Sequence, residues 1–120
     1  MNDLYRKNFG AEGEERAAAF LQEKGFSIIE RNYRAGRIGE IDIIALKKDL
    51  VVFAEVKSRS GDAFGGGIYS INESKKRHLR TAAKVFLASH PSYNTKEYTF
   101  RFDLLLVSGD QIEWIEDIIR

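Results

Sequence analysis

The chain has 120 residues, of which 43% are hydrophobic, and this size and apolar content predict one folded domain over residues 1–120. The absence of cysteine excludes disulfides, zinc sites built on thiolates and cysteine nucleophiles. A net charge of +1 does not by itself indicate nucleic-acid binding. The charges are nevertheless segregated, with five basic residues between positions 75 and 84 and four acidic residues between 110 and 117.

Any bound metal would need oxygen ligands, because cysteine is absent and the two histidines, His78 and His90, lie far apart in sequence. Oxygen ligands favour Mg²⁺ or Mn²⁺. The first ten residues lack the apolar stretch of a signal peptide, and no apolar run reaches the length of a membrane-spanning helix. We therefore expect a cytoplasmic protein that does not associate with a membrane.

The first predicted element is an amphipathic helix over residues 11–24, which Gly25 can end because glycine readily adopts left-handed backbone conformations. The apolar stripe of this helix consists of Ala17, Ala18 and Leu21. One helical turn before the stripe lies Glu14, so periodicity places its carboxylate on the inward side of the helix.

Three strands are predicted next, over residues 26–34, 38–46 and 50–57. The second and third are apolar on both faces near the turn that joins them, which indicates a hairpin at the centre of a covered sheet. A Gly-rich loop follows over residues 58–69. It lacks the Gly-Lys-Ser/Thr ending of a phosphate-binding loop, which argues against nucleotide binding.

A capping box at residues 70–73 predicts the start of a second helix, which runs to about Ser89 before Pro91. Its apolar stripe consists of Leu79, Ala82, Ala83 and Phe86. Strands over residues 98–107 and 111–116 complete the order α-β-β-β-α-β-β, which is that of one compact α/β domain.

The central hairpin carries four charged residues in otherwise apolar strands: Glu40, Asp42, Glu55 and Lys57. Within each strand the two charges are two positions apart and face the same side. A two-residue turn at 48–49 would place Asp42 opposite Glu55. The same register would place Glu40 opposite Lys57. A three-residue loop would shift the pairing by one and put the two carboxylates on opposite faces, so we favour the turn that gathers the charges.

Two facing carboxylates repel each other, and burial would raise the pKa of either unless a positive charge lies nearby. A divalent cation supplies that charge, and Lys57 adds to it. Such a site can hydrolyse a phosphodiester, because the metal polarises a water while a lysine orients it or stabilises developing charge. The alternative is an exposed strand with a simple Glu40–Lys57 ion pair, which leaves the facing carboxylates unexplained.

The segments GEIDIIA at 39–45 and VFAEVKSR at 52–59 resemble the PD-(D/E)xK superfamily of restriction-endonuclease-like nucleases, although Ile41 stands where a proline often precedes the aspartate. Over nearly its full length the chain is similar to the YraN family of small bacterial proteins, thought to be nucleases. The motifs that carry the similarity are Gly10-x-x-Gly13-Glu14, Asn32-Tyr33-Arg34, Gly39-Glu40-Ile41-Asp42, Glu55-Val56-Lys57-Ser58-Arg59, Lys75 with Arg77, and Arg101-Phe102-Asp103.

The resemblance implies a restriction-endonuclease-like α/β fold, with a central mixed β-sheet flanked by helices. It implies that Asp42, Glu55 and Val56 bind Mg²⁺ or Mn²⁺, and that Lys57 is the catalytic lysine. It also implies a catalytic role for Glu14, because archaeal Holliday-junction resolvases of this fold use a glutamate of the first helix. Without the resemblance, Glu14 would be interpreted as an acid near a helix N-terminus, stabilised by the helix dipole.

Basic residues of the second helix are candidates for contacting nucleic acid. Lys75 lies above the inward stripe, from which its ammonium could reach the site or a bound phosphate, or extend to solvent. The residues Lys76, Arg80 and Lys84 recur every four positions and face outward, as on an ordinary solvated face or a phosphate-contacting surface. The predicted nucleic-acid contacts are Arg59, Lys75, Lys76, Arg77, Arg80 and Lys84.

Three residues near the end of the chain need separate interpretations. Arg101 and Trp114 are most simply structural. Asp103, a strand acid beside three leucines, either pairs with a buried arginine or binds metal.

The leading functional hypothesis is a metal-dependent endonuclease that hydrolyses phosphodiester bonds in DNA, with branched and single-stranded DNA among the candidate substrates. The alternative is a non-catalytic nucleic-acid-binding module of a DNA-processing assembly. RNA cleavage is a third hypothesis, since nothing in the sequence indicates recognition of a 2′-hydroxyl. Cutting a junction requires two active sites, so we expect a homodimer or a partner protein.

Overall fold

The computed structural model describes residues 3–59 and 71–119. The elements in chain order are α1 (Asp3–Glu23), β1 (Ser27–Ala35), β2 (Gly39–Lys47), β3 (Leu50–Arg59), α2 (Glu73–Ser89), the 3₁₀ helix η1 (Pro91–Tyr93), β4 (Thr99–Ser108) and β5 (Gln111–Ile115). Apart from the short η1, this is the predicted α-β-β-β-α-β-β order. Helix α1 begins earlier than predicted, at Asp3, and β3 extends to Arg59, into the segment predicted as loop. The rest of that predicted loop lies outside the described residues.

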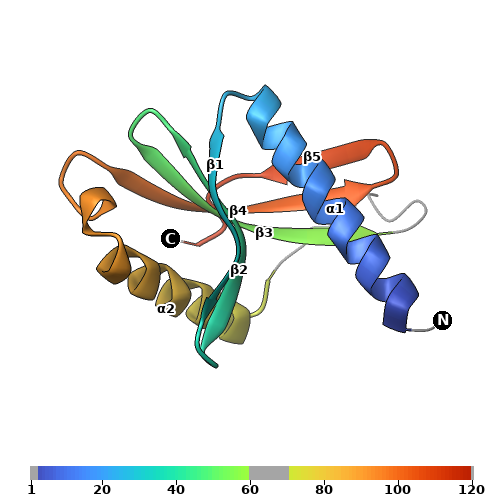
Figure 1. Cartoon of the computed structure of the whole chain (residues 1–120), viewed down its shortest axis with the longest axis horizontal. Coiled ribbons are helices and arrows are strands. Elements are labelled where there is room, and N and C mark those ends of the chain that lie inside the picture. The colour runs from blue at the N-terminus through green and yellow to red at the C-terminus, as the bar shows by residue number, and fades with distance from the viewer. Residues whose placement is uncertain (1–2, 60–70, 120) are drawn as a thin grey trace.

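Five strands within the described residues form one mixed sheet in the order β1-β2-β3-β4-β5. Neighbouring strands are antiparallel except β3 and β4, which run parallel because the chain crosses over through α2 between them. Helix α1 covers one face of the sheet and α2 the other (Figure 1). The predicted restriction-endonuclease-like fold, a mixed sheet flanked by helices, is confirmed.

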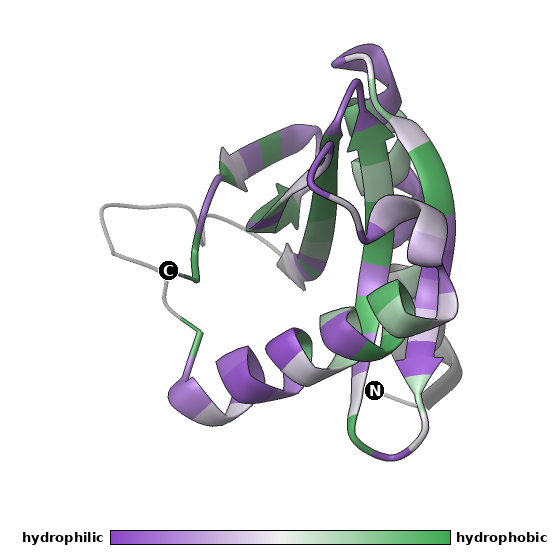
Figure 2. Cartoon of the chain, turned by 90° about the vertical axis from the view of Figure 1, so that its left-hand side faces the viewer, coloured by the Kyte–Doolittle hydropathy of each residue, from purple (hydrophilic) through white to green (hydrophobic). Residues whose placement is uncertain are grey.

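Successive side chains of the central strands point to opposite faces of the sheet and pack in two separate hydrophobic cores. Val52 of β3 is fully buried and packs in the core beneath α1, which includes Leu21. The next residue, Phe53, packs against Phe86 of α2 with ring centroids 6.0 Å apart. Each such buried side chain contributes roughly 1.5–3 kcal/mol relative to an exposed one. The hairpin is therefore covered on both faces, as its apolar pattern predicted, and Figure 2 shows hydrophobic residues gathered in these strands.

The predicted end of the first helix is confirmed, whereas the predicted cap of the second helix is wrong. Gly25 follows α1 with φ 95°, the left-handed conformation expected of a helix terminator. The capping box predicted at residues 70–73 is wrong, since α2 begins at Glu73 and its N-cap is Asn72. The Asn72 side chain accepts a hydrogen bond of 2.8 Å from the Lys75 N–H. Ser70 lies outside the described residues.

The turn between β2 and β3 has the predicted two-residue length. Lys47 lies opposite Leu50, and the ladder continues in this register to Ile43 opposite Ala54. Lys48 adopts φ 55°, a positive value of the kind that two-residue hairpin turns require. The register on which the charged cluster depends is therefore confirmed.

Within residues 3–59 and 71–119, no helix combines the length and the apolar character needed to cross a membrane.

Candidate metal-binding and catalytic site

The charged cluster lies where β2 and β3 separate. The backbone ladder ends at Ile43 opposite Ala54, and Asp42 and Glu55 are the next residues on the two strands. The two carboxylates lie close enough for the charge of Glu55 to raise the pKa of Asp42. At this point a side chain joins the strands, because the Val56 N–H donates a hydrogen bond of 2.8 Å to Asp42 Oδ2. Beyond it β2 runs toward α2 while β3 runs beneath α1, so the strands form a fork (Figure 1). The site occupies this fork.

Glu55 is the buried carboxylate of the site, with only 3% of the residue exposed. Its Oε1 atom faces two ammonium groups, Lys57 Nζ at 3.5 Å and Lys75 Nζ at 3.3 Å. Its Oε2 atom is buried and has no hydrogen-bond partner among the described residues. Leaving a buried polar atom unpaired is costly, so this oxygen is available to a cation.

Asp42 is held in an environment that disfavours its charge. Burial, followed by the negative charges of Glu55 and Glu14, raises the pKa of Asp42 to about 7, although the Val56 N–H and Lys75 oppose the rise. A divalent cation between Asp42 and Glu55 would reverse this effect by favouring both ionised carboxylates. The residues present therefore fit an oxygen-ligated ion such as Mg²⁺ or Mn²⁺.

Glu14 lies at the margin of this site. It is half-buried on α1, and it is close enough for its charge to raise the pKa of Asp42. The close packing of α1 on the end of β3 brings it there, since a Cβ atom at Gly13 would collide with the Ser58 hydroxyl. Among the described residues, however, no three acidic or histidine side chains come together as a metal-ligand group. Two carboxylates thus form the centre, and other oxygen ligands would come from the backbone, water or substrate.

The predicted pairing of Glu40 with Lys57 is wrong. Glu40 lies opposite Arg34 of β1 and forms its ion pair there, at 3.8 Å. The physical reason is the fork, because the β2–β3 pairing covers residues 43–47 of β2, and at Glu40 the strand paired with β2 among the described residues is β1. Lys57 instead pairs with Glu55 on its own strand and keeps 42% of its side chain exposed. Its ammonium is therefore accessible from solvent.

The basic residues of α2 divide between the site and the surface. Lys75 extends into the site, where its ion pair with Glu55 replaces the solvent-directed alternative. Lys76 pairs with Glu73 at 3.4 Å. The remaining basic residues are exposed or half-buried on the outer side of the helix, namely Arg77, Arg80 and Lys84. Arg59 ends β3, and its side chain lies outside the described residues.

Asp103 is a structural carboxylate rather than a metal ligand. It is fully buried and accepts two hydrogen bonds of 2.9 Å from Arg101, one of 2.9 Å from Trp114 Nε1 and one of 3.0 Å from the Asp117 N–H. Its hydrogen bonds also raise the pKa of Arg101. These donors occupy both oxygens and tie the C-terminal segment to β4, so Arg101 and Trp114 are structural as predicted.

Sequence reasoning missed two contributors to the site. One is the N-cap Asn72, which fixes the start of α2 and with it the position of Lys75. The sequence does contain an indication of this role, because asparagine is one of the residues favoured at the N-cap of a helix. The other is the Val56 N–H, whose hydrogen bond to Asp42 depends on the strand fork and has no signal in local sequence.

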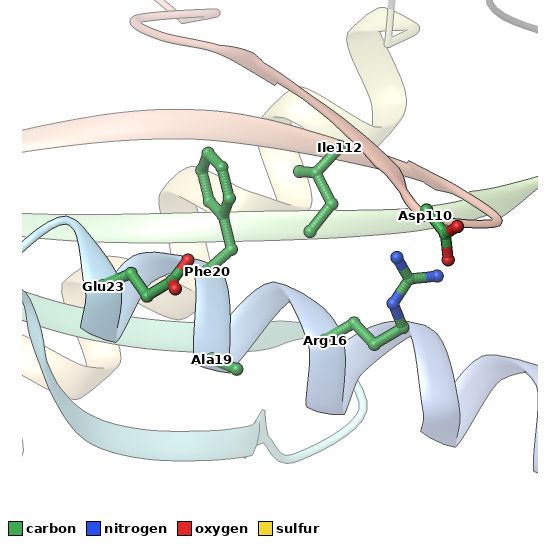
Figure 3. A pocket seen from close by; sticks show the side chains of 6 residues that line it. All are labelled: Arg16, Ala19, Phe20, Glu23, Asp110 and Ile112. Atoms are coloured by element: carbon green, nitrogen blue, oxygen red, sulfur yellow. The ribbon is translucent and has the colours of Figure 1, made fainter.

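A surface pocket of about 410 Å³ lies apart from this site, between α1 and the β4–β5 turn. Figure 3 shows Arg16 extending toward Asp110 across it, with Phe20 and Ile112 forming its apolar wall. None of its lining residues belongs to the carboxylate–lysine cluster, so we assign the pocket no part in the chemistry.

The mixed sheet, its two flanking helices and the carboxylate–lysine cluster at the strand fork define a restriction-endonuclease-like fold. A family model described as Uncharacterised protein family UPF0102 matches residues 13–107, and the chain belongs to this family. A UPF0102 protein of Nitrosomonas europaea is 43% identical over 113 residues, which cover 92% of each chain. One of Clostridium perfringens is 40% identical over 122 residues and 97% of each chain, and one of Alcanivorax borkumensis is 39% identical over 117 residues, 93% of this chain and 91% of that one. The predicted family membership is confirmed, and its description assigns no activity.

Proposed function

We propose that this protein is a Mg²⁺- or Mn²⁺-dependent endonuclease that hydrolyses phosphodiester bonds in DNA. One observation carries the proposal: two carboxylates from adjacent strands meet in a largely buried fork beside an accessible lysine, and one oxygen of Glu55 has no partner among the residues that the structure describes. Such a cluster is expensive to maintain for stability alone, because each buried charge must be compensated. A function that uses a divalent cation explains why it is kept.

Asp42, Glu55 and the backbone of Val56 would hold the metal. When bound, the metal would supply positive charge to the scissile phosphate and acidify a water. Lys57 would stabilise the charge that develops on the phosphate or orient the attacking water, because its ammonium reaches solvent while it contacts Glu55. Lys75 would hold the Glu55 carboxylate in place through its ion pair. Glu14 would contribute from the margin, through a water or the charge balance of the site.

Phosphate contacts are assigned to the basic surface of α2. The exposed or half-buried cations Arg77, Arg80 and Lys84 lie on the same helix as Lys75, with Lys76 and Arg59 as further candidates. The β4–β5 end of the sheet carries acidic residues instead, including Asp110 and Glu113, and would repel a phosphate backbone. DNA would therefore approach the fork from the α2 side. We place this activity in the cytoplasm, in a homodimer or with a partner protein.

The test is cleavage of duplex, single-stranded, flap and four-way DNA by the purified chain with Mg²⁺ or Mn²⁺. We expect Asp42→Ala and Lys57→Ala each to reduce the rate by roughly 100-fold or more. Lys96→Ala is the matched control, because it removes an exposed lysine outside the site and outside α2 and should leave the rate within about twofold of the wild type. Cleavage that persists undiminished in both site variants would show that the activity comes from a contaminant.

A second candidate is a non-catalytic nucleic-acid-binding module. It is favoured by the absence of a third acidic ligand beside Asp42 and Glu55 in the described part of the chain. Calorimetric titration with Mn²⁺ separates the two. Failure to bind Mn²⁺ at millimolar concentration would support the module, whereas binding that disappears in Asp42→Ala would support the nuclease.

A further inference from the structure

The β1–β2 hairpin ends in a tip, residues 35–39, whose two ends contact the rest of the fold and whose turn at Gly36 faces open space within the described part of the chain. Its base is anchored by Ala35, which is only 4% exposed and packs in the core beneath α2. The tip is closed by a 3.0 Å hydrogen bond from the Ile38 N–H to the Ala35 carbonyl. Gly36 adopts φ 59°, and a Cβ atom placed there would meet nothing within 4 Å. The tip therefore projects into open space from a fixed base.

The second strand of the tip is held against α2. A Cβ atom at Gly39 would lie 2.7 Å from the His78 carbonyl oxygen, closer than real side chains approach. Only glycine permits this contact of hairpin and helix. The tip is thus braced on two sides, and a ligand that touches it would cause little loss of conformational entropy.

The tip carries an exposed apolar side chain, and two accessible arginines lie on the same hairpin. Ile38 is 50% exposed, more than any other large hydrophobic residue among the side chains that the structure describes. Its neighbour Arg37 is exposed, and 77% of the Arg34 side chain is accessible. A lone exposed isoleucine is ordinary on a protein surface. Arg34 also forms an ion pair with Glu40 at 3.8 Å, an exposed pair of the kind that contributes little and that a phosphate can replace. An exposed isoleucine with two accessible arginines on the same hairpin matches a ligand that combines an apolar face with phosphates.

The tip also lies close to the candidate site. Asp42 follows Gly39 by three residues on β2, roughly 10 Å along an extended strand. On the other side, Gly39 packs against the backbone of His78, the residue that follows Arg77 on α2. A nucleic acid that reached the fork from the α2 side would pass this tip.

We propose that the hairpin tip contacts DNA at an interruption of the duplex, where Ile38 stacks on an exposed base pair and Arg34 and Arg37 contact the flanking phosphates. The proposal rests on the proposed nuclease function and names its substrate class: DNA with a nick, flap or branch. Cationic side chains supply affinity without sequence preference, whereas the apolar contact distinguishes an exposed base pair from a continuous base stack.

The balance of two effects selects interrupted DNA over continuous duplex. Burial of the exposed half of one isoleucine releases less free energy than unstacking of a continuous base step costs. A single Ile38 therefore does not open an intact duplex. At a nick or branch point the face of a base pair is already accessible, so the same contact is gained without that cost.

The test is equilibrium binding of the full chain to continuous and nicked duplexes of equal length, in EDTA so that nothing is cut. A 2-aminopurine base beside the nick reports stacking. We expect tighter binding to the nicked duplex, and an Ile38→Ala variant that binds it roughly fivefold more weakly with a changed 2-aminopurine signal. Val85→Ala is the matched control, because Val85 is an exposed aliphatic residue of α2, 36% accessible and outside the tip. It should bind both DNAs like the wild type.

A second variant isolates the phosphate contacts. Arg37→Gln should weaken binding to both DNAs alike and reduce the slope of log affinity against log salt concentration by about one. Three results would overturn the proposal: equal affinity for both DNAs, an Ile38→Ala variant that matches Val85→Ala on nicked duplex, or a change in oligomeric state of free Ile38→Ala by light scattering. The last would assign Ile38 to a contact between copies.

Failure of this inference is distinguishable from failure of the nuclease proposal. A chain that binds nicked DNA through Ile38 but cuts no DNA with Mn²⁺ contradicts the nuclease proposal alone. A chain that cuts DNA while Ile38→Ala behaves as wild type contradicts only the role of the tip.

Discussion

The environment of Asp42 predicts that neutralising this residue stabilises the metal-free protein at high pH. Burial and neighbouring carboxylates raise its pKa from 3.8 to about 7. Between these values the native chain retains a proton that the unfolded chain releases, so the free energy of unfolding falls as pH rises. The loss is complete above pH 7 and absent below pH 3.8. At 1.36 kcal/mol per pKa unit, it amounts to about 4 kcal/mol at most.

Asp42→Asn removes this titration while its amide oxygen can still accept the Val56 hydrogen bond. We expect the variant to exceed the wild type in free energy of unfolding by about 1–4 kcal/mol at pH 8, less if the native site relaxes, and to match it near pH 4. Urea unfolding in EDTA at several pH values measures the difference. Other groups titrate in both proteins, so their contributions cancel in the comparison.

The matched control is Asp49→Asn, which removes an exposed carboxylate from the β2–β3 turn. Its effect should be small and nearly independent of pH. If the difference between Asp42→Asn and wild type also stays constant across the pH range, or if the variant is the less stable protein at pH 8, the electrostatic account of the fork is wrong.

Three further predictions test other parts of the structure. Metal binding should release close to one proton per chain at pH 6 and almost none at pH 8.5, because Asp42 must ionise; calorimetry in buffers of different ionisation enthalpy measures this. Asp103→Ala should lower the free energy of unfolding by about 3–5 kcal/mol, because it leaves buried donors of Arg101 and Trp114 without an acceptor. Glu116→Ala, which removes the exposed partner of Arg101, should cost less than about 1 kcal/mol in the same denaturant titration. Gly39→Ala should lower the free energy of unfolding by about 1–3 kcal/mol, since its Cβ would press on His78; loss of less than about 0.5 kcal/mol would show that the hairpin is not braced there.

The architecture was largely accessible from sequence because its signals are local. The apolar runs of β2 and β3 extend over both faces, which happens only in a covered sheet. The two residues between the strands set the register as far as Ile43 and Ala54, and that register predicts that the next residues, Asp42 and Glu55, lie close together. The centre of the candidate site therefore follows from turn length and side-chain alternation.

The failures concern features that depend on tertiary geometry. Nothing local indicates that β2 and β3 separate at Asp42, so the sequence predicts Glu40 opposite Lys57, whereas Glu40 pairs with Arg34 of β1. Ser70 and Asn72 are both acceptable N-cap residues, so the local sequence does not decide where α2 begins. The structure shows that Asn72 is the N-cap. Periodicity put Lys75 on the inward side of its helix, but it could not say that the ammonium would meet Glu55.

The strand fork has a consequence for the order of folding. Asp42 and Glu55 lie on one hairpin with a two-residue turn, whereas the parallel β3–β4 pair forms only after the long crossover through α2 has closed. The two carboxylates therefore meet early, and their repulsion is present when the transition state forms. A divalent ion that relieves it should raise the refolding rate more than it lowers the unfolding rate, which stopped-flow chevron measurements with and without Mn²⁺ would reveal. The charged pair would then influence how rapidly the chain folds, before any substrate is encountered.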